Sequence, residues 1–356
     1  MVPLPTLRFA WVAKDRARFG LKSQIGASRF PTLTMKAILG ETYGQPEKVL
    51  HLRDVNKPTP GEGKVVVKVN AASANISDFY ALAGFARIFG GGLTKPKDPS
   101  VGTDFAGQVE AVGAGVTRFK AGDEVFGSCN GSFAEFALAR EGRIATKPAG
   151  VSFEDAAASP IAGLTALQCL RDKGSVQAGQ EVCVNGASGG VGTFAVQIAK
   201  SLGAGVTGVC STRNVEQAGR IGADYVVDYT KEDFTRDGRT YDLICDIAGN
   251  RSISDYKRAL KPRGRCLVVG FANNPLLGMA KYFVLGKLRS TGGKKVGIMG
   301  IAKMNSQDLD SLSQLLVSGK VKPVIERRYE LGETAQALQY IGEKHTRGKV
   351  IISVSH

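Results

Sequence analysis

The order of hydrophobic and polar positions divides the chain into two regions of different periodicity. From Met35 to about Ala156, short apolar runs are separated by turns that contain glycine and proline; the runs include MKAIL, VVVKVNAASA, FAGQVEAVG, DEVFGS and FAEFALA. Runs of this length between turn residues are typical of β-strands. This region is therefore predicted to form a small domain that resembles a β-barrel.

The periodicity becomes helical in SFEDAAASPIAGLTALQCLRD, residues 152–172. Ser152, with Asp155 three residues later, resembles the capped start of a helix. The pattern predicts that a helical segment follows the strand-rich region.

From about Gln180, predicted strands alternate with predicted helices. The strands are EVCVNG, GVTGVCS, DYVVDY, YDLICDIAG and GRCLVVG, and the first three are separated by the helices TFAVQIAKSLG and NVEQAGRIG. A strand at VGIMG, a helix near residues 306–318 and a strand at IISVSH follow, and the last is a candidate to return to the first domain. Such alternation predicts an α/β fold with a doubly wound parallel sheet.

The sequence NGASGGVG, residues 185–192, joins a predicted strand to a predicted helix. Gly189 and Gly190 allow the backbone to turn tightly and to approach a pyrophosphate, and Gly192 allows the helix to pack close to the strand. The amide groups at the helix start would face the phosphates. We interpret the loop as a dinucleotide site; the alternative is a glycine-rich turn without a ligand. The predicted contacts are Ala187, Ser188, Gly189, Gly190, Val191 and Gly192.

The end of the second strand of this region carries no carboxylate. An NAD site usually places an acidic residue there, about 20 residues after the glycine loop, to bind the adenine ribose. This chain has Ser211, Arg213 and Asn214 instead, and hydroxyl, guanidinium and amide groups suit a 2′-phosphate. The segment favours NADPH, unless Arg213 is only a solvated residue at a helix start.

Composition and charge narrow the function classes. The 356 residues suit two domains, and 43% hydrophobic with 22% charged residues is typical of globular proteins. The net charge of +15 fits a solvated basic surface, or attraction to a phosphorylated cofactor, an anionic membrane surface or nucleic acid. Aromatic residues are not interleaved with the basic ones, so nucleic-acid binding is not expected.

No metal site is expected. The six cysteines include no C-x-x-C pair, and the histidines are His51, His345 and His356. The cysteines lie mostly in apolar runs, as buried thiols of a reducing compartment do.

The first 34 residues are basic, with Asp15 as their one acid. They read either as a transit peptide for the mitochondrion or chloroplast, or as sequence before a true start at Met35, which would favour the cytoplasm. No apolar run reaches the ~18 residues of a transmembrane helix.

Taken together, several segments resemble the medium-chain dehydrogenase/reductase superfamily, and within it the zinc-free quinone oxidoreductase branch. They are NAASANISDFY, VGTDFAGQVEAVGAGV, FKAGDEVFG, IAGLTALQCL, GASGGVG, the GAD segment at residues 222–229 and RGKVIISV. The resemblance implies a basic extension over residues 1–34, a GroES-like catalytic domain over 35–157 completed by 301–356, and a Rossmann NADPH-binding domain over 158–300. It also implies a homodimer.

The same resemblance assigns roles to individual residues. Zinc-using relatives have a catalytic cysteine at the position of Asn75 and a histidine at that of Thr103, so zinc-independent chemistry is implied. Asn75, Asp78 and Tyr80 resemble the active-site segment of the reductases, although Tyr80 also suits packing and Asp78 a structural hydrogen bond. Tyr229 would lie near the adenosine phosphate. The residues implied to border the nicotinamide are Thr165, Ala248, Gly249, Gly270 and Phe271.

These features predict a reductase that transfers hydride from NADPH to a quinone or an α,β-unsaturated carbonyl, with Tyr80 or water as the proton source. Phe85 and Phe89 are spaced to line an apolar pocket, or to pack in the core. One alternative is an enoyl-thioester or lipid-enal reductase, for which the apolar, basic segment at residues 273–290 would guide lipophilic substrates or contact a membrane peripherally. The other is an NADPH-binding protein with a structural or RNA-binding role.

Overall fold

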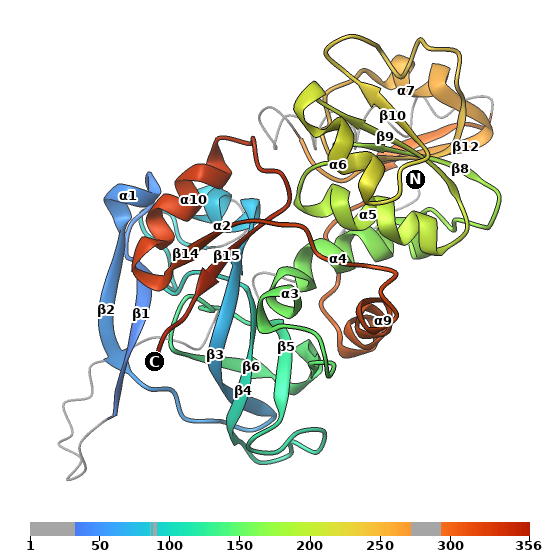
Figure 1. The fold of residues 1–356 in the computed structure, drawn as a ribbon. Helices are drawn as coiled ribbons and strands as arrows, with labels where there is room; N and C mark the ends of the chain where they lie inside the picture. The colour runs from blue at the N-terminus through green and yellow to red at the C-terminus, as the bar shows by residue number, and fades with distance from the viewer. Residues whose placement is uncertain (1–32, 86, 88–90, 272–292) are drawn as a thin grey trace, which may run out of the picture.

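Two β-sheets of different construction organise the chain (Figure 1). The computed structural model describes residues 33–85, 87, 91–271 and 293–356. The predictions for the extension before residue 33, for Phe89 and for residues 273–290 lie outside these residues. The predicted α/β class, with a strand-rich domain and a doubly wound parallel sheet, is confirmed.

The first sheet contains seven strands in a mostly antiparallel arrangement. Its order is β14-β15-β3-β4-β5-β7, and β6 pairs with the N-terminal half of β3. β1 and β2 form a separate antiparallel pair. The strands are β1 (Thr34–Gly40), β2 (Leu50–Asn56), β3 (Lys64–Ala74), β4 (Asp104–Val112), β5 (Glu124–Ser128), β6 (Phe136–Arg140), β7 (Ile144–Thr146), β14 (Ile325–Glu330) and β15 (Lys349–Ser353).

The C-terminal strand lies beside a strand from the beginning of the chain. β15 pairs antiparallel with β3, with Val350 opposite Ala74, and Figure 1 shows the red β15 alongside the blue β3. Four of the five β15 residues are buried, which explains the continuous apolar run VII after Lys349. This pairing brings a C-terminal lysine next to the N-terminal active-site segment.

The second sheet is parallel and has the order β10-β9-β8-β11-β12-β13. The chain starts in the middle of the sheet and winds to both edges, with helices as crossovers, as doubly wound folds do. Its strands are β8 (Glu181–Asn185), β9 (Gly205–Cys210), β10 (Tyr225–Asp228), β11 (Tyr241–Asp246), β12 (Leu260–Val268) and β13 (Lys295–Ile298). Its helices include α5 (Gly190–Ser201), α6 (Val215–Arg220) and α7 (Ile253–Ala259).

The helical segment between the two sheets is broken, although its periodicity predicts one stretch. It forms α3 (Phe153–Ala158), α4 (Pro160–Leu167) and a π-helical turn, η3 (Gln168–Lys173). Ser152 caps α3 as predicted, since its hydroxyl accepts the Asp155 amide at 3.0 Å. The break falls at Pro160, because proline has no N–H to continue the helix and is tolerated only in a first turn.

Four further helices cover the first sheet and the junction: α1 (Pro46–Val49), α2 (Ile76–Leu82), α9 (Ser306–Val317) and α10 (Thr334–Gly342). Short helical turns are η2 (Glu141–Arg143), η4 (Thr212–Asn214) and η5 (Leu331–Glu333). α2 and α10 pack on each other, and the Phe79 ring of α2 occupies the space beside Gly342.

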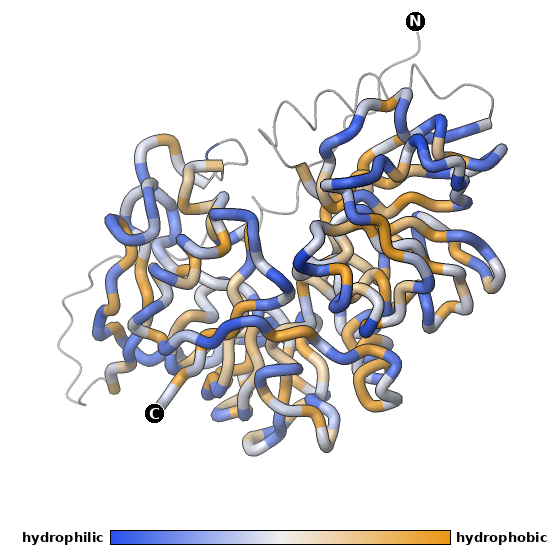
Figure 2. The backbone as a smooth tube through the Cα atoms, turned by 45° about the horizontal axis from the view of Figure 1, so that its top comes forward, coloured by the Kyte–Doolittle hydropathy of each residue, from blue (hydrophilic) through white to orange (hydrophobic). Residues whose placement is uncertain are grey.

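Apolar residues concentrate inside both lobes, while hydrophilic ones follow the outer loops (Figure 2). The largest buried cluster runs from the parallel sheet through the alanines of α3 to Phe126 and Ala145 of the first sheet. The lobes are therefore joined by a continuous apolar core. Within the described residues, no helix combines the length and apolar character needed to cross a membrane.

Candidate functional site

The glycine loop between β8 and α5 has the geometry that its sequence predicts. A Cβ atom on Gly192 would lie 2.0 Å from the carbonyl oxygen of Gly186, so the first turn of α5 packs against the end of β8 more closely than any side chain allows. In the described structure, the amides of Gly190, Val191 and Gly192 donate to no protein acceptor. These donors at the start of a 12-residue helix suit an anion.

Asn214 ties this loop to the end of β9. Its Nδ2 donates to the Ser188 hydroxyl at 3.0 Å and to the Ser211 hydroxyl at 3.1 Å, while its buried Oδ1 has no hydrogen-bond partner among the described residues. The structure thus brings together three predicted cofactor residues. The unsatisfied Oδ1 is a buried acceptor for which a ligand hydroxyl would be a partner.

Arg213 and Tyr229 lie next to this group, at the ends of β9 and β10. Arg213 is exposed, and its Nη2 donates to the carbonyl oxygen of His345 at 2.7 Å, across the lobes. The Tyr229 amide donates to the Cys210 carbonyl, and its side chain is 52% exposed. The carboxylate that sequence reasoning did not expect here is Asp228, which accepts hydrogen bonds from the hydroxyls of Thr212 and Thr230.

Asp246 is the last residue of β11, and it organises the loops in the other half of the carboxyl end of the parallel sheet. Its buried carboxylate accepts from the Asn185 amide at 2.7 Å, from the Gly249 N–H at 3.0 Å and from the Tyr256 hydroxyl. Burial raises the pKa of Asp246, and these donors oppose the rise. The network fixes the loop after β11 beside the glycine loop.

Three of the residues predicted to border the nicotinamide lie against one another in this region. A Cβ on Gly249 would lie 2.2 Å from the Gly270 carbonyl oxygen, and Gly249 has a φ of +60°. Gly249 therefore lies directly against Gly270 and Phe271. Thr165 is half-buried on α4, which packs on α5.

The predicted active-site segment begins α2. Asn75 caps the helix together with Asp78: the Asn75 N–H donates to Asp78 Oδ2 at 2.9 Å, and the Thr103 hydroxyl donates to Asp78 Oδ1 at 2.9 Å. Both Asp78 oxygens are thus engaged. The geometry matches the structural alternative considered for Asp78.

Two residues of this cluster were not recognised as site residues from the sequence. Asp104, fully buried at the start of β4, accepts the Asn75 Nδ2 at 3.0 Å and the Ile161 N–H at the start of α4. Lys349, 3% exposed at the start of β15, donates from Nζ to Asn75 Oδ1 at 2.5 Å. The sequence signal for Lys349 was a cation directly before the apolar run of a strand, within a segment quoted for the family resemblance.

The cluster holds two buried carboxyl groups and one buried ammonium group. Burial raises the pKa of Asp104 to about 7 and that of Asp78 to about 6, and the nearby Lys349 opposes both rises. Burial also lowers the pKa of Lys349, against the attraction of the two carboxylates. These three groups form the titratable centre of the site.

Tyr80 lies two residues beyond Asp78 on α2 and is half-buried. Its ring centroid is 6.2 Å from that of Phe85, and the Lys344 ammonium lies 5.7 Å from its ring centroid. Within the described residues, its hydroxyl makes no hydrogen bond, so both the packing role and the donor role predicted for Tyr80 stay consistent with the geometry.

In the described part of the chain, no group of three or more histidine, cysteine, aspartate or glutamate residues is arranged to hold a metal ion. All six cysteines are buried. Desolvation raises the pKa of the Cys210 thiol to about 11, which keeps it protonated at neutral pH.

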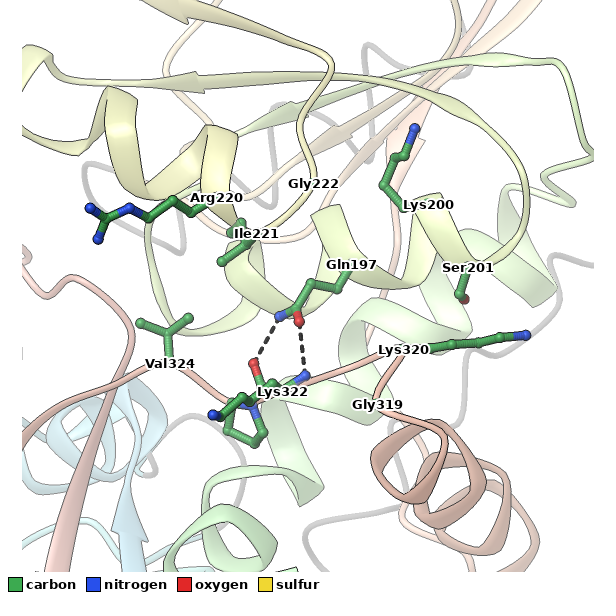
Figure 3. A pocket seen from close by; sticks show the side chains of 11 residues that line it. Gln197, Lys200, Ser201, Arg220, Ile221, Gly222, Gly319, Lys320, Lys322 and Val324 are labelled. Atoms are coloured by element: carbon green, nitrogen blue, oxygen red, sulfur yellow. Dashed lines mark hydrogen bonds between the residues drawn. The ribbon is translucent and has the colours of Figure 1, made fainter.

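A groove of about 750 Å³ lies away from this site, at the other end of α5 (Figure 3). Gln197 bridges it: its amide donates to the Lys322 carbonyl at 3.0 Å and accepts the Lys322 N–H at 2.8 Å. Its rim carries Lys200, Arg220, Lys320 and Lys322, of which the first two are paired with Asp224 and Glu216. The groove marks the joint between the lobes, on the order of 16 Å along α5 from the glycine loop.

A dinucleotide fits the residues at the carboxyl ends of the parallel strands. The unpaired amides of α5, the Gly192 contact and the Asn214 acceptor form one face. The exposed Tyr229 and Arg213 flank it at one end, and the loops after β11 and β12 border it at the other. The polar cluster of Asn75, Asp104 and Lys349 adjoins it, since the Lys349 Cδ would be 3.3 Å from a Cβ on Gly190.

Comparisons with known proteins match both domains of the chain. The profile of the alcohol dehydrogenase GroES-like domain matches residues 61–149, and that of the zinc-binding dehydrogenase family matches residues 221–352. The chain is 33% identical to the chloroplast envelope quinone oxidoreductase homolog of Arabidopsis thaliana, over 89% of this chain and 98% of that one.

Solved structures are similar along the whole described fold. The quinone oxidoreductase of Coxiella burnetii superposes with a TM-score of 0.79 at 30% identity, covering 91% of this chain and 100% of the other. The Escherichia coli quinone oxidoreductase, solved in complex with NADPH, gives a TM-score of 0.77 at 27% identity, covering 89% and 99%.

Proposed function

Because the chain belongs to the quinone oxidoreductase-like branch of the medium-chain dehydrogenase/reductase superfamily, whose members are NAD(P)H-dependent oxidoreductases, we propose that it is a zinc-independent reductase that uses NADPH. Its substrate is a quinone or an α,β-unsaturated carbonyl. The observation that carries this proposal is the junction of the two half-sites: the Lys349 Cδ lies 3.3 Å from the position that a Cβ would take on Gly190 of the glycine loop, and the Lys349 Nζ donates to Asn75 Oδ1 of the polar cluster.

Different residues at the carboxyl ends of the parallel strands bind different parts of NADPH. The α5 amides bind the pyrophosphate, and the Arg213 guanidinium with the Ser211 hydroxyl recognises the 2′-phosphate. Tyr229 offers an exposed ring for the adenosine end. Thr165 and the backbone of Ala248, Gly249, Gly270 and Phe271 position the nicotinamide. The structure of an NADPH-bound relative from Escherichia coli supports this choice of cofactor.

Bound NADPH supplies a hydride to the electron-poor acceptor, and the protein positions the acceptor and stabilises the negative charge that reaches its oxygen. Tyr80 is the proposed donor at that oxygen, with water as the competing proton source. Asn75 does not serve as this donor, since its two amide hydrogens go to Ser73 O and Asp104 Oδ2. Asn75 and Asp78 instead hold the start of α2 in place.

The residue types at the cluster support zinc independence. By resemblance, the amide of Asn75 and the hydroxyl of Thr103 stand where zinc-using relatives carry a cysteine and a histidine, and neither is a preferred zinc ligand. In addition, a buried ammonium lies 2.5 Å from Asn75 Oδ1, and its charge would repel a divalent cation at this position.

The same hydride step suits an enoyl-thioester or a lipid enal, which differ in the length of the chain behind the reacting double bond. The aromatic pair of Tyr80 and Phe85 would contact the acceptor in either case. We favour the quinone or short enone because the similar proteins carry the name quinone oxidoreductase.

A homodimer is also proposed, and β13 at the end of the six-stranded sheet offers a pairing edge.

Steady-state oxidation of NADPH and NADH tests the proposal against an ortho-quinone, a short enone, a long 2-alkenal and an enoyl-CoA. We expect NADPH to be preferred, and Arg213→Ala to reduce that preference by about 10- to 100-fold in kcat/KM, because a charge-assisted contact to a phosphate is worth about 1.5–3 kcal/mol. Arg220→Ala is the matched control, since Arg220 pairs with Glu216 on α6. An Arg213→Ala enzyme with unchanged preference would contradict the assignment of the 2′-phosphate site.

A further inference from the structure

Lys349 has an unusual position for a lysine. It is 3% exposed, and its Nζ lies 2.5 Å from Asn75 Oδ1 and 3.9 Å from Asp104 Oδ2. Lysine is rarely buried to this extent unless it is paired, because desolvation of the ammonium is costly. We propose that Lys349 is a positioning residue of the hydride-transfer site, whose ammonium fixes the Asn75 amide and the Asp104 carboxylate beside the cofactor loop. This inference rests on the proposed function.

The Asn75 amide has one orientation that satisfies its surroundings. Nδ2 donates to Asp104 Oδ2 at 3.0 Å and to the Ser73 carbonyl at 3.2 Å, and Oδ1 accepts from Lys349. Without the ammonium, Oδ1 would lose its donor, and the preference of the amide for this orientation would weaken. Lys349 therefore controls which edge of Asn75 faces the carboxylate.

The lysine stem connects the cluster to the cofactor loop. The Lys349 Cδ would lie 3.3 Å from a Cβ on Gly190, the first residue of α5. The backbone N–H of Lys349 is held by the Val324 carbonyl at 2.7 Å. The backbone of Lys349 is thus fixed at the start of β15, and its stem passes beside the start of α5 on the way to the cluster.

Lys349 also sets the charge of Asp104. The titratable groups that face Asp104 are Lys349, Asp78 and the thiol of Cys129. Burial raises the pKa of Asp104 to about 7, and the ammonium counteracts this rise. With Lys349 in place, a large fraction of Asp104 is ionised at neutral pH and accepts the Asn75 N–H and the Ile161 N–H as a carboxylate. The latter bond also anchors α4, which carries Thr165.

Lys349→Met keeps the stem and removes the charge. We expect kcat to fall by about 10²-fold, as for the loss of one preorganised polar group, while the Kd for NADPH, measured by nucleotide fluorescence, changes by less than about fivefold. The acidic limb of the pH profile of kcat should move to higher pH, because the pKa of Asp104 rises when its counter-ion is lost. Lys147→Met is the matched control: Lys147 is also buried and pairs with Glu124 at 2.9 Å, so its loss should lower the Tm and leave kcat unchanged.

The double variant Asp104→Asn with Lys349→Met separates positioning from folding. It restores charge balance, so we expect its Tm to recover relative to Lys349→Met while kcat stays about 10²-fold low. Recovery of kcat to within about threefold of wild type would overturn the proposal, since it would show that the lysine only balances a buried charge. Unchanged kcat and an unchanged acidic limb in Lys349→Met would overturn it as well.

The apo protein gives a readout that does not depend on turnover. Asp104 has a pKa of about 7 when folded and about 3.8 when unfolded, so the folded state binds the extra proton between these values. Stability against unfolding should therefore rise as the pH falls from 8 to 6, and Lys349→Met should shift this rise to higher pH. Asp104→Asn should remove the contribution of Asp104 to this pH dependence of stability. Absence of the shift would contradict the inference; failure of wild type to oxidise NADPH would instead contradict the proposed function.

Discussion

Replacing Gly192 with alanine is expected to destabilise the parallel-sheet lobe by about 3 kcal/mol or more and to abolish detectable NADPH binding. The added Cβ would stand 2.0 Å from the Gly186 carbonyl oxygen and 2.9 Å from the Ala187 backbone. Both neighbours are backbone atoms at the end of β8, so neither can move aside as a flexible side chain would. Thermal unfolding and nucleotide fluorescence titration measure the two effects.

Gly189→Ala provides the comparison, because the nearest atom to its added Cβ is 3.8 Å away. Gly189 has a φ of −81°, which alanine adopts freely. We expect a stability change of about 1 kcal/mol or less, but an NADPH affinity about 10- to 100-fold weaker, since the methyl group would intrude on the approaching pyrophosphate. Equal NADPH affinity in Gly189→Ala and wild type would show that the pyrophosphate does not approach here.

Replacing Asp246 with alanine is expected to cost about 3–5 kcal/mol of unfolding free energy. Asn185, Gly249 and Tyr256 would each lose a hydrogen-bond acceptor in a buried position. The loop that carries Ala248 and Gly249 would lose its anchor, so KM for the cofactor should rise together with the loss of stability. Denaturant unfolding and initial rates at saturating acceptor check this prediction.

Asp242→Ala on the same strand is the control. Its carboxylate is partly exposed and contacts the Glu181 N–H and the Lys261 ammonium, both at 2.8 Å. A partly exposed pair of this kind contributes about 1 kcal/mol or less. If Asp246→Ala and Asp242→Ala were equally mild, the buried network would not be what fixes the loop after β11.

The parts of the site that local sequence determines were predictable. The glycine loop, its strand and its helix lie within about twenty consecutive residues, and Gly192 has a local steric reason in the backbone of Gly186 and Ala187. The six-stranded sheet follows from alternation of apolar strands and helices. The resemblance predicts that Asn75 and Asp78 belong to an active-site segment, and the structure adds that they cap α2.

The residues that the sequence did not reveal reach the site through long-range pairing. Lys349 meets Asn75 because β15 pairs with β3, although 274 residues separate them. Asp104 lies on β4, which also pairs with β3. A charged residue next to a buried strand has no local sign of its partner, because periodicity reports which face is buried and not which strand lies alongside.

Two local expectations also needed tertiary context. The helical periodicity of residues 152–172 does not register the break at Pro160, since apolar spacing continues through it. The cofactor was the one partner expected for Arg213, whereas its guanidinium also donates to the His345 carbonyl of the other lobe. Only the folded chain shows that the C-terminal loop reaches this position.

The central claim is that the protein transfers hydride from NADPH to the acceptor in a site that orients both. The most direct test supplies NADPH deuterated on one or the other face of C4, together with the best acceptor, and weighs the NADP⁺ formed. The account predicts that NADP⁺ from one epimer retains all its deuterium and that from the other retains none, because the bound nicotinamide presents a single face. Equal retention from both epimers, or no oxidation of NADPH with any acceptor, would contradict it.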